Sequence, residues 1–261
     1  MNFTIKTAAL QNITTSCMIL GVYQNKALPE VTAEVNKLTH RALGNIIEAG
    51  DISGTLGQTL LIHNPEGVRA KRLLLVGLGK KGELDLKKFI KIINSVAQGL
   101  KKYALGDALD TLINLPVKNA GSEKCGQMIA QILQNSVYRY TQTKSKKGSK
   151  PELKKVDVYL VDKTQRSKLR KALDIGSAVA SGMALTREMG NLPGNICTPT
   201  FLGEQAQLLA KRNKLLKTKV LSEAQMRRLG MGSLLSVGNG SDENSALIIM
   251  EYNGASEKTK P

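Results

Sequence analysis

Apolar residues occur along the chain in short blocks that follow two different periods. Blocks with period two, or with continuous apolar residues, predict strands, and apolar residues three or four positions apart predict helices. The expected strands cover residues 3–8, 15–23, 60–62, 72–76, 112–115, 156–161, 219–221 and 246–252. The expected helices cover residues 29–49, 85–103, 126–138, 165–189, 199–212 and 222–229. Repeated alternation of strands and helices predicts an α/β fold.

One polar segment interrupts this pattern. Residues 139–155 are polar and basic and have no apolar period, which predicts an exposed loop. The helix expected over residues 165–189 has few breakers, and a helix of that length between two α/β blocks often bridges domains. We therefore expect an N-terminal α/β domain over residues 1–163, and a linker helix with the beginning of a second domain over residues 164–261.

The charge of the chain raises the question of a nucleic-acid partner. The net charge is +17, and residues 144–171 hold eleven Lys or Arg against three acids. Such a segment either follows a phosphate backbone or forms a solvated surface, and both interpretations stay open. Aromatic residues make up only 3% of the chain, which argues against base-stacking platforms. The candidate nucleic-acid contacts are Lys144, Lys146, Lys147, Lys150, Lys154 and Lys155.

The cysteines and the hydropathy bear on location. Cys17, Cys125 and Cys197 are odd in number and form no CxxC pair, which fits a reducing compartment and buried thiols. No run of about 18 apolar residues occurs, and the first residues do not resemble a secretory signal. We expect a cytoplasmic protein without a membrane span.

The sequence contains one motif that is typical of nucleotide binding. Gly77, Gly79 and Gly82 form a GxGxxG after an expected strand and before an expected helix. The acidic residue that should follow about 20 positions later is absent, so we interpret the motif as a tight turn between strand and helix. His40 and His63 have no second ligand at metal-binding spacing, and no HExxH, GxSxG or Walker motif occurs.

Residues 186–200 carry a more specific pattern. They read TREMGNLPGNICTPT and resemble the signature R-x-x-x-N-x-P-x-N-x-x-T-P, with which the catalytic domain of the leucyl aminopeptidase (cytosol aminopeptidase) family opens. Residues 73–79, 220–223, 229–241 and 248–252 resemble further stretches of the same family. The signature positions are Arg187, Asn191, Pro193, Asn195, Thr198 and Pro199.

The resemblance implies a fold and an activity. It implies an N-terminal mixed-sheet α/β domain (macro-like), followed by an incomplete α/β catalytic domain. Family members are hexameric exopeptidases that remove N-terminal residues from peptides with two divalent ions, manganese, zinc or magnesium. Some bacterial members bind DNA as well.

The family motifs that hold the ions do not occur in this chain. Patterns of the kind V-G-K-G-x-T-F-D and N-T-D-A-E-G-R are absent, and the first is expected just after Pro261. We therefore assign no catalytic, metal-binding or substrate-binding residue, and we expect the chain to be truncated before the metal site, to bind no ion and to be inactive alone. The alternatives are a DNA-binding module acting through residues 144–171 and a non-catalytic remnant.

Overall fold

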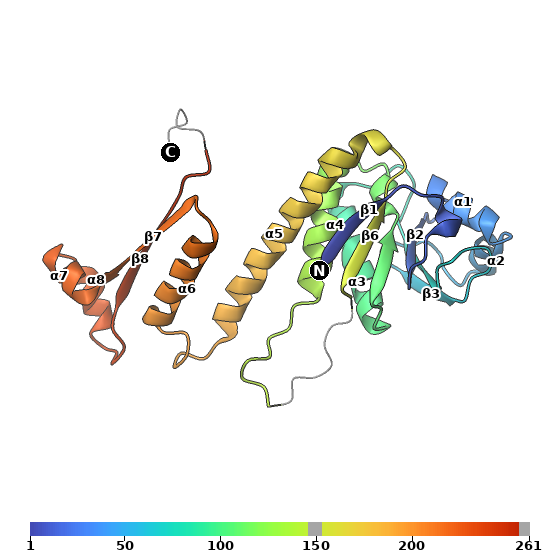
Figure 1. Ribbon diagram of the computed structural model, residues 1–261. Helices are drawn as coiled ribbons and strands as arrows, with labels where there is room; N and C mark the ends of the chain where they lie inside the picture. Colours follow the sequence, from blue (N-terminus) through green and yellow to red (C-terminus); the bar gives the residue numbers. More distant parts are fainter. Residues whose placement is uncertain (146–152, 256–261) are drawn as a thin grey trace. The chain divides into compact units, whose positions relative to one another are not determined.

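The computed structural model describes residues 1–145 and 153–255. The chain forms two compact units, Met1–Arg187 and Glu188–Pro261, and each is described by itself (Figure 1). Both units combine helices with strands, so the expected α/β class is confirmed.

A six-stranded sheet forms the centre of the first unit. Its order is β1-β6-β5-β2-β4-β3, and every neighbouring pair is parallel except β3 and β4. All five residues of β2 are buried, as expected for a parallel strand that is covered on both faces. The expected mixed sheet is therefore present, with strands β1 (Asn2–Lys6), β2 (Met18–Val22), β3 (Thr59–His63), β4 (Arg72–Gly77), β5 (Asp107–Asp110) and β6 (Lys155–Tyr159).

Helices cover both faces of this sheet (Figure 1). One core joins Ile19 and Leu74 of the sheet to α3, α4 and α5, and the other joins Leu20 and Leu75 to α1 and α2. A Cβ on Gly176 of α5 would lie 2.3 Å from the Gln127 carbonyl oxygen of α4, so glycine permits this close helix approach. The helices are α1 (Glu30–Leu38), α2 (Ala42–Ala49), α3 (Leu86–Lys102), α4 (Ser122–Ser136) and α5 (Arg166–Asn191), with 3-10 turns η1 (Leu10–Asn12), η2 (Leu112–Asn114) and η3 (Lys163–Gln165).

The single helix expected over residues 29–49 is wrong. The structure has two helices there, because the backbone of His40 and Arg41 is left-handed, with φ of 50° and 64°. At the C-terminal end of α1, the Thr39 hydroxyl donates a hydrogen bond to the Val35 carbonyl at 3.0 Å. The helical spacing of apolar residues continues from α1 into α2, so the sequence pattern predicted one helix where the structure has two.

The strand expected over residues 112–115 is also wrong. The strand of this region is β5, and the apolar residues after it form η2. Ile113 donates its backbone N–H to the Asp110 carboxylate at 3.3 Å. This N–H therefore bonds within a local turn and not to a neighbouring strand. A short buried run cannot be assigned to strand or turn from its hydropathy alone.

The second unit is built around an antiparallel pair of strands, β7 and β8. Helix α6 packs on this pair: a Cβ on Gly203 would touch the Val220 side chain, and the Thr218 hydroxyl donates to the Ala206 carbonyl at 3.2 Å. Leu221 joins Met226 and Leu235 in a small core. The elements are α6 (Pro199–Arg212), β7 (Leu216–Ser222), α7 (Glu223–Arg228), α8 (Gly232–Gly238) and β8 (Ala246–Tyr252), of which α8 was not expected.

Candidate functional site

The lysines expected to contact nucleic acid are only partly described. Lys146, Lys147 and Lys150 lie outside the described residues. Lys144 is exposed in the loop after α4, and Lys154 is exposed immediately before β6. The Lys155 ammonium lies 2.9 Å from the buried Asp157 carboxylate, so its charge is already compensated within the fold.

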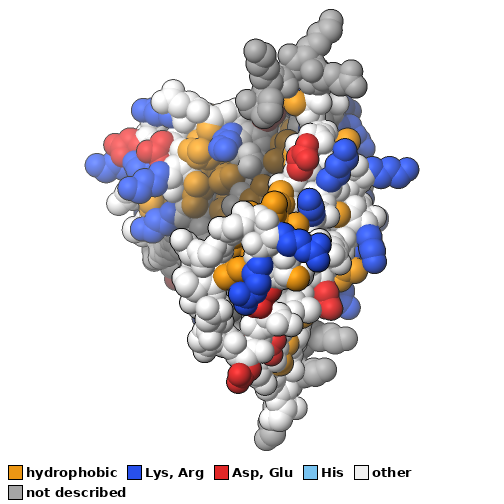
Figure 2. All heavy atoms as spheres, turned by 90° about the vertical axis from the view of Figure 1, so that its left-hand side faces the viewer, with side chains coloured by type: hydrophobic (Ala, Val, Ile, Leu, Met, Phe, Trp, Pro, Cys, Tyr) orange, Lys and Arg blue, Asp and Glu red, His pale blue; other side chains and the backbone are white. Residues whose placement is uncertain are grey.

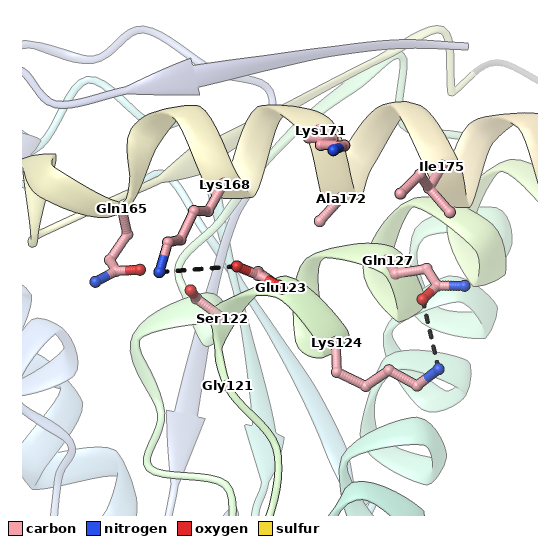
Figure 3. A pocket seen from close by; sticks show the side chains of 10 residues that line it. All are labelled: Gly121, Ser122, Glu123, Lys124, Gln127, Gln165, Lys168, Lys171, Ala172 and Ile175. Atoms are coloured by element: carbon pink, nitrogen blue, oxygen red, sulfur yellow. Dashed lines mark hydrogen bonds and ion pairs between the residues drawn. The ribbon is translucent and has the colours of Figure 1, made fainter. Parts of the chain in front are cut away.

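A basic pocket lies between α4 and α5 (Figure 3). It has a volume of about 860 Å³, and Lys168 and Lys171 of α5 line it together with Lys124 of α4. The Lys168 ammonium lies 4.0 Å from the Glu123 carboxylate, and Lys124 donates to the Gln127 side chain at 3.4 Å. No side chain caps the N-terminus of α4 at Gly121, and uncapped helix N-termini favour anions.

The sequence pointed to only part of this pocket. Lys168 and Lys171 belong to the basic segment, but Lys124 comes from another helix and was missed. The signal that could have found Lys124 was the start of α4 after Gly121. The hydropathy pattern placed the start of this helix four residues too late, so Lys124 fell outside it. The pocket can attract phosphate or carboxylate groups, although Glu123 offsets part of its positive charge.

The glycine motif serves chain packing. Gly79 donates its N–H to the Gly54 carbonyl at 2.9 Å and accepts a hydrogen bond from the Gln24 N–H at 2.9 Å. A Cβ on Gly77 would lie 2.0 Å from the Thr55 carbonyl oxygen. Residues 54–55 therefore occupy the approach that a pyrophosphate would need, which supports the interpretation as a tight turn.

Two thiols and one acid are buried inside the first unit. Burial raises the pKa of Cys17 to about 12 and that of Cys125 to about 11, with the Asp110 charge adding to the second shift. Both cysteines are therefore protonated thiols, which are poor nucleophiles. Burial also raises the pKa of Asp110 to about 7, although the backbone N–H groups of Ile113 and Leu112 oppose this rise.

The signature residues build the end of one helix and the start of the next. The Arg187 guanidinium lies over the Tyr138 ring, 4.2 Å from its centroid, and donates to Asn135 at the end of α4. The Pro193 carbonyl accepts from the N–H groups of Ile196 and Cys197, each at 2.9 Å, which forms a turn.

Thr198 and Pro199 then start α6. The Thr198 hydroxyl oxygen accepts a hydrogen bond from the Phe201 N–H at 3.2 Å, and Pro199 occupies the first helical turn. Threonine caps and proline in the first turn are both typical of helix starts. The structure therefore gives Arg187, Pro193, Thr198 and Pro199 structural roles.

The described residues do not fit a two-metal centre. Within residues 1–145 and 153–255, no three His, Cys, Asp or Glu side chains come together as ligands. None of the described helices has the length and apolarity that a bilayer crossing requires.

Comparison with solved structures defines the class of fold. The chain superposes on a tomato leucine aminopeptidase mutant with a TM-score of 0.79 and 20% identity, over 98% of this chain and 52% of that one. It also matches the bottromycin maturation enzyme BotP in complex with Mn, with a TM-score of 0.70 and 20% identity, over 91% of this chain and 45% of that one. The fold is thus that of the leucine aminopeptidases.

Sequence comparison then gives the family. Residues 19–147 match the model for the cytosol aminopeptidase family, N-terminal domain, and residues 184–261 match the model for its catalytic domain. Relatives include the cytosol aminopeptidase of Pseudomonas aeruginosa and a probable cytosol aminopeptidase of Stutzerimonas stutzeri, each 38% identical over 261 residues. The chain belongs to the cytosol aminopeptidase family, and it spans 52% of the length of these relatives.

Proposed function

We propose that this chain supplies the N-terminal domain and the first part of the catalytic domain of a metal-dependent leucyl aminopeptidase, which removes N-terminal residues from peptides. The observation that carries the proposal is the order of the two family matches, residues 19–147 and then residues 184–261. The signature at residues 187–199 adds support, because it lies at the start of the catalytic-domain match.

The cofactor and the assembly belong to the same proposal. The family resemblance implies two divalent ions, manganese or zinc, and a homo-hexamer acting on peptides. The structural neighbour BotP is seen in complex with Mn, which supports a divalent metal ion in the proposed enzyme. The relatives' name and the three free cysteines support a cytosolic location. Because the described residues offer no ligand set, the chain by itself is proposed to be inactive.

A chimera tests this function. The chain is joined to the second half of the Pseudomonas aeruginosa relative, and release of leucine from a leucyl-anilide is measured with added manganese. We expect turnover from the chimera and none from the chain alone, with the intact relative as the positive control. A folded hexameric chimera without turnover would contradict the proposed activity, and metal-dependent turnover by the chain alone would contradict its proposed inactivity.

The basic pocket between α4 and α5 supports a second candidate function, binding of DNA through residues 144–171. Lys168 and Lys171 of that segment line the pocket together with Lys124, so three lysines from two helices contribute to its surface. A gel shift over a salt titration tests it, since each phosphate contact that is lost lowers the salt slope by about 1. We expect the Lys168→Gln and Lys171→Gln pair to lower affinity and slope, whereas Lys37→Gln and Lys101→Gln, on other helices, serve as the charge-matched control.

A further inference from the structure

The basic pocket between α4 and α5 differs from the rest of the basic surface in its shape. Figure 2 shows Lys and Arg side chains scattered over the face of the molecule that it presents, so positive charge alone does not identify a site. The pocket has a volume of about 860 Å³, within the range of about 300–1,000 Å³ that is usual for small-molecule sites. Lys124 lines it from α4, and Lys168 and Lys171 line it from α5, so a group bound there meets lysines from two walls (Figure 3).

One acid lines the pocket, and it offsets only part of this charge. The Glu123 carboxylate lies 4.0 Å from the Lys168 ammonium, and the two side chains are 63% and 64% exposed. Ion pairs this exposed are weak, so a ligand of higher charge can replace Glu123 as the partner of Lys168. Lys124 donates to the neutral Gln127 side chain, and Lys171 forms no ion pair with any residue that the structure describes. The lining therefore keeps an excess of positive charge.

Neutral hydrogen-bonding groups complete the lining. The side chains of Ser122 and Gln165 face the pocket from its two walls. The first hydrogen bond within α4 joins the Cys125 N–H to the Gly121 carbonyl at 3.1 Å, so the N–H groups of residues 122–124 have no acceptor within the helix. Lysines and backbone N–H groups together suit the oxygen atoms of a phosphate group.

The pocket also lies at the end of the sheet where ligands of parallel sheets are found. α4 and α5 begin after the carboxyl ends of β5 and β6, and ligands of open α/β sheets bind outside the carboxyl ends of the strands. The exposed Lys154 precedes β6 and is separated from α5 by this strand of five residues, roughly 16 Å at about 3.3 Å per residue. The pocket lysines therefore form a local cluster, and not one end of a continuous basic track along residues 144–171.

We infer that this pocket binds a small polyphosphate, a compound in which two or more linked phosphate groups carry the charge. Three lysines against one acid favour a ligand with more than one negative charge, and the volume suits a small molecule. None of the ten lining residues is aromatic, so contacts to phosphate oxygens, and not stacking on a base, provide the recognition. The inference goes beyond the proposed aminopeptidase function and does not depend on it.

Titration of the whole chain with inorganic pyrophosphate at constant ionic strength tests the inference. We expect saturable binding at one site, with changes in amide NMR signals concentrated at residues 121–127 and 165–175. Adenosine triphosphate and inorganic tripolyphosphate should bind equally well, because they share the phosphate chain. Non-saturating changes at lysines on all helices, or binding of the nucleotide alone, would overturn the inference.

Two substitutions at the start of α4 change the charge of the pocket in opposite directions. Ser122→Asp places an acid in the first turn, where it stabilises a helix but repels a bound anion. We expect it to weaken pyrophosphate binding at least tenfold without lowering the thermal unfolding midpoint, whereas the neutral Ser122→Asn has a small effect. Glu123→Gln removes the acid beside Lys168 and should tighten binding severalfold. Equal binding by Ser122→Asp and Ser122→Asn, or weaker binding by Glu123→Gln, would contradict a phosphate site.

Lysine variants test whether both walls contribute. We expect Lys124→Gln on α4 and Lys168→Gln on α5 each to weaken pyrophosphate binding severalfold, whereas Lys37→Gln and Lys101→Gln, at exposed positions on other helices, should bind as the parent does. Equal effects of the pocket and control variants would show that only the overall charge matters, and the inference would be wrong. A DNA duplex provides the competing case. If the duplex binds and pyrophosphate neither binds nor displaces it, the pocket is not a polyphosphate site and the DNA-binding candidate stands.

Discussion

Strands β2 and β8 have similar sequences and very different surroundings. β2 reads MILGV and pairs with β4 on one edge and with β5 on the other, and all its residues are buried. β8 reads ALIIMEY, pairs with β7 alone, and exposes its last four residues. An apolar run thus indicates the environment that a strand is suited to, whereas the other elements of the fold decide whether it is covered.

The same contrast holds for the two units as wholes. The first unit has two cores with many completely buried side chains, one on each face of its sheet. The second unit has a core of Leu221, Met226 and Leu235, with partly buried neighbours. Because apolar burial drives folding, we expect most of the chain's stability to lie in the first unit.

Removal of α5 should have the largest effect. The division expected at residue 163 implies that residues 1–163 fold alone, but α5 inserts Leu169 and Leu173 into the core of the first unit. We expect a chain ending at residue 163 to be less stable than one ending at residue 187 by about 4 kcal/mol, or about 2 per leucine. Urea unfolding of both chains measures the difference. Equal midpoints and slopes would favour the boundary at residue 163.

Substitution of one isoleucine in each strand tests the comparison directly. Ile19 of β2 is completely buried, and Ile249 of β8 is 44% exposed. We expect Ile19→Ala to cost about 2–5 kcal/mol because it leaves a cavity. Ile249→Ala should cost less than about 1 kcal/mol, because part of its surface is already hydrated. Hydrogen exchange resolved by peptide reports each unit separately, and equal losses would contradict the contrast between the strands.

The pH dependence of stability should also come from the first unit, where both buried acids of the described chain, Asp110 and Asp157, lie. The pKa of Asp110 is raised to about 7 from 3.8, so the folded state keeps a proton that the unfolded state releases. The resulting stability is complete below pH 3.8 and is lost as the pH rises through 7.

An amide at this position mimics the protonated acid at every pH. We expect Asp110→Asn to exceed the parent in free energy of unfolding by about 4 kcal/mol more at pH 8.5 than at about pH 4. Urea titrations at the two pH values measure this change. Asp51→Asn, at an exposed position after α2, is the matched control. A constant difference between Asp110→Asn and the parent would show that Asp110 is ionised in the fold.

The sequence indicated the periodic elements well, because helices such as α3 and strands such as β2 carry their own hydropathy pattern. It failed where backbone conformation decides, as at His40 and Arg41, and where a buried run forms a 3-10 turn, as at Leu112–Asn114. Only part of the basic pocket could be predicted from the sequence. Lys124 comes close to Lys168 and Lys171 only because the two helices that carry them pack together. No hydropathy pattern contains that information.

The smallest expected effect concerns the start of α6 in the second unit. Thr198 accepts a hydrogen bond from the Phe201 N–H, and loss of such a cap costs about 1 kcal/mol. We therefore expect Thr198→Ala to destabilise α6 by that amount, whereas Thr198→Ser keeps the hydroxyl and changes stability by a few tenths of that amount. Exchange of the Phe201 amide measures the effect locally. Because the second unit has a small core, this loss is a larger fraction of its stability than the same loss would be in the first unit. If alanine and serine gave the same exchange rate, Thr198 would not stabilise α6 as a cap, and the turn formed at the Pro193 carbonyl would have to set the start of the helix.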